Sequence, residues 1–186
     1  MYGHAVKCKE QLDADNRFLD KCDQEFKNRK EASDYYTTRG WDYFRKDSIE
    51  LATKRFNQGW LLDSANAGPY WGFAAIAGQQ KDYELSISYF DRAHQYDSTN
   101  AELCNDAVIS LGQRFFEINN TAYLRKAIGY LMTATRYHPN DSRTYASLVK
   151  CYINLPQKDS AQKYLTIVDK LDPEMIAPEI RQELFH

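Results

Sequence analysis

The sequence predicts an all-α protein: a right-handed superhelix of about four helix–turn–helix repeats, with a capping helix at each end. Three observations predict this fold. Similar segment ends recur along the chain, the recurrence has a period of 34 residues, and within each period small and large residues stand three, four and seven positions apart. A 34-residue period is typical of a repeated pair of helices, and the shorter spacings place these residues on one helical face.

The first predicted element covers residues 1–32 and is an N-terminal capping helix, or an arm that docks elsewhere. A helix is expected over residues 9–28, where apolar residues follow at intervals of seven, three and four and polar residues occupy the opposite face. These apolar residues are Leu12, Leu19, Cys22 and Phe26. Residues 27–30 are expected to link the helix to the first repeat. Such a cap is needed because the terminal unit of an array otherwise exposes an apolar face.

Four repeat units follow, and their similar ends define their bounds. The units are 33–66, 67–100, 101–141 and 142–175. Asn66 and Asn100 end the first two units and stand 34 residues apart, as do Pro139 and Pro173 near the ends of the last two.

The second helix of each unit carries a small residue, a large residue four positions later and a small or aliphatic one three positions after that. The residues are Ala52, Phe56 and Gly59; Ser86, Phe90 and Ala93; Ala127, Leu131 and Ala134; and Ala161, Leu165 and Val168. Small residues let two antiparallel helices approach, and the large residue fills the space between them. We therefore expect these twelve residues in the core.

With four units in register, the chain resembles the tetratricopeptide-repeat (TPR) family over about residues 33–175. The matching first-helix residues are Tyr36, Gly40 and Tyr43; Tyr70, Phe73, Ala74 and Ala77; Cys104, Ala107, Val108 and Leu111; and Tyr145, Leu148, Val149 and Tyr152. The resemblance implies a scaffold that is not an enzyme. Its partner would be another protein or a peptide, held as an extended segment or a helix in the concave groove.

The third unit is seven residues longer than the others, and the extra residues fall around 112–121. We favour an extended helix pair with a longer turn, which loop entropy tolerates at little cost. The alternative is a protrusion that carries Phe115 and Phe116 to a partner. After the fourth unit, residues 176–186 are expected to form a C-terminal capping helix that lays Ile180, Leu184 and Phe185 on the last repeat.

The family resemblance also implies which residues face the groove. The predicted partner-binding residues are Trp41, Phe44, Arg45, Trp71, Asn105, Asp106, Ile109, Arg143 and Lys150. Gly68, Gly72 and Gly78 are expected to let a partner backbone approach. A carboxylate clamp is not expected, because Glu102 and Asp106 stand where that site needs cations. An alternative places Trp41 and Trp71 in the core, covered by the N-terminal helix.

Composition excludes several other functions. Twenty-four Lys and Arg against 26 Asp and Glu give a net charge of −2, which does not favour nucleic acid or an anionic membrane. No apolar run approaches the length of a membrane span. The histidines His4, His94, His138 and His186 predict no Ser–His–Asp or Cys–His arrangement, and neither a metal nor another cofactor is expected.

The four cysteines permit disulfides Cys8–Cys22 and Cys104–Cys151 without requiring them. In one straight helix Cys8 and Cys22 would stand about 21 Å apart, so a bond between them needs a break in that helix.

Residues 40–44, 55–63 and 70–73 resemble bacterial TPR proteins of the cell envelope, several of them predicted lipoproteins. The resemblance favours the periplasm or envelope, with the cytoplasm as the alternative, since the start of the chain shows no apolar stretch of a signal peptide. The leading function is an adaptor in an envelope or secretion assembly, and the alternative is an immunity protein that occludes a bacterial toxin. The oligomeric state stays open.

Overall fold

The structure is a computed structural model that describes residues 6–185. Residues 1–5 and 186, which include His4, His186 and the start of the predicted N-terminal cap, lie outside the described residues. Between them the chain forms ten α-helices, and no strand occurs in the described part. The helices are α1 (Lys9–Glu25), α2 (Arg29–Phe44), α3 (Ile49–Leu62), α4 (Ala67–Gln79), α5 (Tyr83–Tyr96), α6 (Ala101–Ile118), α7 (Ala122–Tyr137), α8 (Ser142–Asn154), α9 (Lys158–Leu171) and α10 (Pro178–Phe185).

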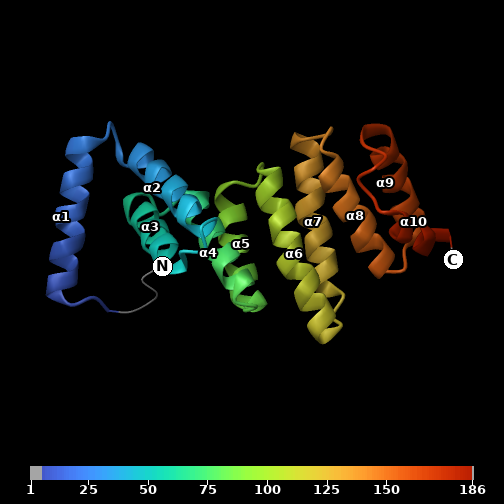
Figure 1. Cartoon of the computed structure of the whole chain (residues 1–186), viewed down its shortest axis with the longest axis horizontal. Helices are drawn as coiled ribbons and strands as arrows, with labels where there is room; N and C mark the ends of the chain where they lie inside the picture. The colour runs from blue at the N-terminus through green and yellow to red at the C-terminus, as the bar shows by residue number, and fades with distance from the viewer. Residues whose placement is uncertain (1–5, 186) are drawn as a thin grey trace.

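The helices follow one another along a single row, with α1 at one end and α10 at the other (Figure 1). The pairs α2/α3, α4/α5, α6/α7 and α8/α9 pack most closely, and each pair stacks on the next. The first helices also contact one another, α2 with α4, α4 with α6 and α6 with α8. In a stacked array the side where helices approach across units is the concave side, so the first helices line the groove.

The ends of the first three units are helix N-caps. Asn66, Asn100 and Asp141 each accept a hydrogen bond from a backbone N–H in the first turn of the following helix, at 2.8–3.2 Å. These bonds satisfy amide groups that a helix start otherwise leaves unpaired. The recurring Asn or Asp therefore sets where each new unit begins.

All twelve residues expected in the core of the second helices are buried. Phe56 on α3 shows why the small residues are needed. Its ring has no exposed surface and lies between Gly40 on α2 and Gly72 on α4. A Cβ atom at either glycine would collide with the Phe56 ring. The two glycines thus let one phenylalanine join two successive units.

This packing corrects the expected role of Gly72 in the groove. Gly72 faces Phe56, a Cβ at Gly68 would stand 2.6 Å from Thr37 Cγ2, and one at Gly78 would stand 3.2 Å from Ser110 Oγ. At all three positions an added Cβ would point at a neighbouring helix, and the buried Gly72 gives a partner backbone no access, whereas Gly68 and Gly78 are partly exposed and each lines a pocket. Small residues at helix–helix contacts and small residues at ligand sites look alike in a sequence.

The third unit absorbs its extra residues in its helices. Helix α6 has 18 residues and α7 has 16, and only residues 119–121 separate them. Asn119 turns the chain with a left-handed φ of 50°, a conformation that Asn tolerates. The expected extension of the helix pair is present, but the expected longer turn is wrong. Phe115 is buried in the core, whereas Phe116 is 66% exposed.

The N-terminal helix α1 packs on α2 at the end of the array (Figure 1). Phe18, Leu19 and Phe26 gather around the buried Cys22, and Phe18 meets Tyr36 edge-on at 5.2 Å. The expected linker at 27–30 is wrong in its second half, because α2 begins at Arg29. Its N-cap Asn28 accepts the Glu31 amide at 2.9 Å, a pattern of Asn followed three residues later by Glu that marks a helix start.

At the other end, α10 packs on α8 and α9. Leu184 is buried there and Ile180 is partly buried against the same cluster, while the Phe185 side chain lies outside the described part. The four cysteines are free thiols, and α1 runs without a break between Cys8 and Cys22. Within residues 6–185 no helix combines the length and apolar character that a bilayer crossing requires.

Candidate functional site

A pocket at the N-terminal end of the groove gathers five of the nine predicted binding residues. It has a volume of about 450 Å³, and we name it the tryptophan pocket. Its lining residues are Thr38, Trp41, Phe44, Arg45, Trp71, Glu102 and Asp106. They come from α2, α4 and α6 and from the C-cap of α2, Arg45, so the pocket exists only because three first helices stack side by side.

Aromatic contacts fix the shape of the tryptophan pocket. The Trp41 ring meets Trp71 edge-on at 5.2 Å, Phe44 at 5.6 Å and the core residue Phe56 at 5.4 Å. Trp41 and Trp71 are each partly buried, which leaves part of both rings on the pocket wall. The contacts of α1 run through Phe18 and Phe26 to the outer end of α2, so α1 does not cover the two tryptophans. Rigid, half-buried aromatic rings are the usual anchors of a protein-binding surface.

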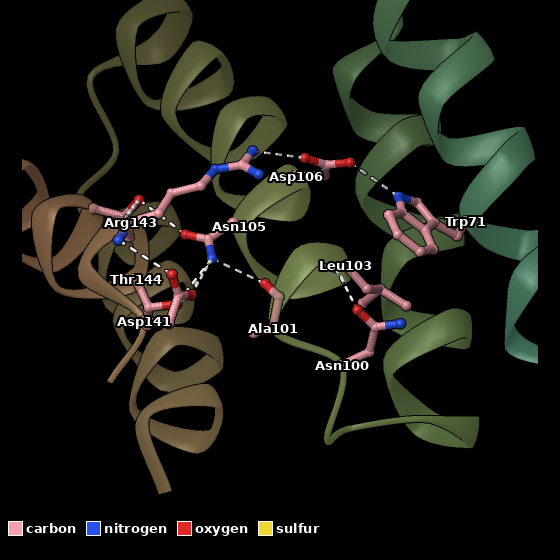
Figure 2. A network of polar contacts seen from close by, with 10 residues as sticks. Trp71, Asn100, Ala101, Leu103, Asn105, Asp106, Asp141, Arg143 and Thr144 are labelled. Atoms are coloured by element: carbon pink, nitrogen blue, oxygen red, sulfur yellow. Dashed lines mark hydrogen bonds and ion pairs between the residues drawn. The ribbon is translucent and has the colours of Figure 1, made fainter. Parts of the chain in front are cut away.

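Asp106 joins three first helices across the groove (Figure 2). Its carboxylate accepts the Trp71 indole N–H from α4 at 3.1 Å and the Arg143 guanidinium from α8 at 3.0 Å. The bond to Trp71 holds the indole against the pocket wall. Arg143 and Asp106 are 51% and 35% exposed, so solvent screens this ion pair and its net strength is modest.

Asn105 is buried, at 3% exposure, beneath the groove floor. Its amide donates to the Ala101 carbonyl at 2.9 Å and to Thr144 Oγ1 at 2.8 Å, and it accepts from Ser147 at 3.0 Å (Figure 2). With these bonds made inside the protein, Asn105 ties α6 to α8. We therefore assign it to the joint between two units rather than to direct contact with a partner.

A second pocket, of about 350 Å³, lies further along the groove between α6 and α8, and we name it the Ile109 pocket. Its main lining residues are Val108, Ile109, Phe116, Ala146, Lys150 and Met175. Asn105 and Arg143 also line it, so the other four predicted binding residues meet here. Ile109 is 59% exposed and Phe116 66% exposed, which is unusual for large apolar side chains.

The sequence analysis missed that Gly112, Phe116 and Met175 belong to this second pocket. Ile109 and Phe116 are seven residues apart with Gly112 between them, a spacing that places all three on one face of α6. That signal was present in the sequence. Met175 had no such signal, because it comes from the segment after α9 and only the tertiary fold brings it here.

The two pockets differ in charge. Two acidic residues and one cation line the tryptophan pocket. Arg143 and Lys150 line the Ile109 pocket, and no acidic residue does. The Asp106–Arg143 ion pair lies between the two, so the groove changes sign along its length.

One pair of side chains departs from the sequence analysis, which expected no Cys–His arrangement. Cys104 Sγ lies 3.6 Å from His94 Nδ1, and His94 stacks on Tyr130 at 4.2 Å. The thiol is fully buried, and burial raises its pKa to about 11. Burial also lowers the pKa of His94. Both effects favour a neutral thiol and a neutral imidazole, whereas nucleophilic cysteines need the thiolate. In the described part, no cluster of His, Cys, Asp or Glu suits a metal ion.

No family model matches the chain. A curated relative, coatomer subunit epsilon of Dictyostelium discoideum, is 25% identical over 138 residues, which cover 70% of this chain and 43% of the relative. The chain therefore spans less than half the length of that relative.

Several solved structures are similar to more than four fifths of the chain. PilF of Pseudomonas aeruginosa has a TM-score of 0.68 at 20% identity, covering 84% of this chain and 67% of its own. YrrB, described as a TPR protein with an unusual peptide-binding site, has a TM-score of 0.63 at 18% identity, covering 81% and 83%. MamA of Desulfovibrio magneticus has a TM-score of 0.63 at 17% identity, covering 82% and 81%. At these identities the likeness shows the fold alone.

Proposed function

We propose that this chain, which has the tetratricopeptide-repeat fold, is a non-enzymatic scaffold that holds a segment of a partner protein in its concave groove. The tryptophan pocket carries the proposal. Trp41 and Trp71 offer rigid apolar surface, and Asp106 holds the Trp71 indole in place. An aromatic side chain fixed before binding loses little conformational entropy on binding, so its contact area contributes efficiently to affinity.

YrrB, a structural neighbour with the same fold, is described as having a peptide-binding site, which supports a peptide or protein segment as the ligand. The neutral Cys104–His94 pair lies outside both pockets and lends no support to a catalytic role. A location in the bacterial envelope is part of the proposal and rests on the residue resemblance alone. The identity of the partner will separate an adaptor from an inhibitor of a toxin.

Photo-crosslinking tests the groove directly. Thr38 lines the tryptophan pocket on α2, and Thr166 lies on α9; both are exposed and both donate to the carbonyl four residues earlier at 3.0 Å. We expect a photoreactive residue in place of Thr38 to capture a specific partner in lysate of the source cell. The same residue in place of Thr166 is the matched control and should capture none. Equal capture at both positions would move the site away from the groove.

The captured partner then allows a quantitative test. Trp71→Ala is expected to weaken its binding by on the order of 2 kcal/mol, or about 30-fold in Kd, with the helical circular dichroism spectrum unchanged. If Trp71→Ala unfolds the array, the indole belongs to the core. An unchanged Kd in a folded variant would remove Trp71 from the site.

A further inference from the structure

Apolar side chains of the Ile109 pocket face solvent on the concave side of the array. Ile109 and Phe116 are 59% and 66% exposed and share one face of α6. Gly112 lies between them, and a Cβ atom there would meet nothing within 4 Å. At this point the groove has room that no part of the described chain fills, in contrast to the tightly packed glycines near Phe56.

The length of α6 creates this surface. Helix α6 has 18 residues, whereas the first helices α4 and α8 have 13 each. Phe115 and Phe116 both lie in the added turns, and only Phe115 turns into the core. Phe116 therefore extends the apolar wall of the groove beyond the length that α4 and α8 provide.

The charged residues that line the Ile109 pocket itself, Arg143 and Lys150, have one sign. Arg143 is neutralised by Asp106 at 3.0 Å, but no ion pair involves Lys150 within the described part of the chain. Helix α8 contains no Asp or Glu, and no acidic residue lines the pocket. An uncompensated ammonium group thus stands next to exposed aliphatic and aromatic surface.

We infer that the Ile109 pocket binds a partner segment in which a large apolar side chain is flanked by an Asp or Glu. The apolar side chain would lie among Val108, Ile109 and Phe116, and the carboxylate would meet Lys150. This inference rests on the proposed function, because it assigns a chemistry to the segment that the groove holds. Asp106 in the tryptophan pocket and Ile109 in the second pocket are one turn apart on α6, so one partner segment can occupy both pockets. In such a segment the group that meets Lys150 is an Asp or Glu side chain and not the carboxylate at the end of the partner chain.

The two parts of this site have different roles. Burial of exposed apolar surface supplies most of the affinity. The exposed Lys150 is screened by solvent, so it contributes mainly to selection of the partner and to its direction in the groove. The opposite charges of the two pockets fix that direction, with the acidic end of the segment at α8 and its other end beside Glu102 and Asp106.

Synthetic peptides test the inference without knowledge of the natural partner. Three fluorescein-labelled, C-amidated peptides of equal length carry Leu-Leu-Asp-Asp, Leu-Leu-Lys-Lys or Ser-Ser-Asp-Asp at their centre. A fourth ends in Leu-Leu with a free carboxylate. By fluorescence anisotropy with the full chain, we expect the first to bind at least about 10-fold tighter than the other three. Tightest binding by the fourth would overturn the assignment of a side-chain carboxylate.

Three variants locate the binding. Ile109→Ser and Phe116→Ser change exposed side chains and are expected to weaken the first peptide at least about 10-fold while the circular dichroism spectrum stays unchanged. Lys150→Glu is expected to reverse the preference between the Asp and Lys peptides. Lys54→Glu on α3 makes the same change of charge at an exposed site outside both pockets and should leave that preference unchanged.

The outcomes separate this inference from the proposed function. An unchanged preference in Lys150→Glu, or a loss of peptide binding in Trp71→Ala but not in Phe116→Ser, overturns the inference. So does a concentration-dependent dimer that Phe116→Ser abolishes, because a second copy would then cover the pocket. If none of the peptides binds while Thr38 still captures a partner by crosslinking, the inference fails and the proposed function stands.

Discussion

The tryptophan pocket and the Ile109 pocket lie in one groove and share α6, yet they are built differently. The first is aromatic and acidic, and its floor is a tight joint in which Phe56 packs against Gly40 and Gly72. The second combines apolar side chains with two cations, and a Cβ atom built at Gly112 would meet open space. Asp106 and Arg143 form an ion pair between them.

The difference shows how a repeat array acquires function. At the tryptophan pocket, the side chains that offer binding surface also pack on the core, since Trp41 contacts both Trp71 and Phe56. At the Ile109 pocket, the exposed residues Ile109 and Phe116 are added to a joint that Asn105 already holds together. Substitutions of Trp41 and Trp71 should therefore affect stability as well as binding, whereas substitutions of the exposed Ile109 and Phe116 should affect binding alone.

Alanine at two helical glycines gives the largest expected contrast. Gly72→Ala places a methyl group against the buried Phe56 ring and is expected to lower the free energy of unfolding by about 2 kcal/mol through overpacking. Gly112→Ala meets open space and is expected to raise it by up to about 1 kcal/mol, because alanine favours the helix. Urea unfolding followed by circular dichroism measures both. If Gly72→Ala and Gly112→Ala change the free energy of unfolding equally, the packing around the two glycines does not differ.

The bridge between the pockets should have an intermediate effect. Asp106→Ala removes the bonds to Trp71 and Arg143 and is expected to lower the free energy of unfolding by about 1 kcal/mol, a value reduced by the exposure of both charged partners. Asp42→Ala is the control, since Asp42 pairs with Arg39 and Arg45 within α2 alone. We expect a loss below about 0.5 kcal/mol there. If Asp106→Ala and Asp42→Ala lower the free energy of unfolding by the same amount, the bonds of Asp106 to neighbouring units do not contribute to stability.

The fold could be predicted because its determinants repeat. Small and large residues at Ala52, Phe56 and the equivalent positions of the other units follow from close helix packing, and all of them are buried. A pattern that occurs four times exposes its period even where single matches are weak. The helix start at Asn28 was missed because the expected start of the first unit was taken from the 34-residue period and not from the N-cap residue.

The site was harder to predict because it depends on contacts between units. The family pattern selects residues of the groove, but it does not distinguish Asn105, whose amide is used inside the protein, from the exposed Ile109. Helix periodicity also cannot bring His94 and Cys104 together, since they lie on different helices. Similarly, the residues around Gly72 in the sequence do not show whether a glycine is there to make room for a partner or for the Phe56 ring.

Cys151 gives an effect that appears only at alkaline pH, and it tests whether the inner part of the Ile109 pocket excludes water. It lines that pocket, is 3% exposed, and burial raises the pKa of its thiol to about 12. An unfolded cysteine has a pKa of about 8.5, so above that pH the unfolded chain loses a proton that the folded chain retains. This contribution to stability is therefore fully present below pH ~8.5 and is lost as the pH rises.

As the pH rises from about 8 to about 9.5, ionisation of Cys151 in the unfolded chain should lower the free energy of unfolding by about 1 kcal/mol. Cys151→Val lacks this thiol, so over the same interval its free energy of unfolding should fall by about 1 kcal/mol less than that of the unsubstituted chain. Cys8→Ala, at an exposed thiol, is the control and should follow the unsubstituted chain. The tryptophan pocket has no cysteine in its lining and makes no such contribution. Identical pH dependence in Cys151→Val and the unsubstituted chain would mean that water reaches the thiol. The Ile109 pocket would then be a hydrated opening between α6 and α8. A partner side chain bound there would stay in contact with water on its inner side.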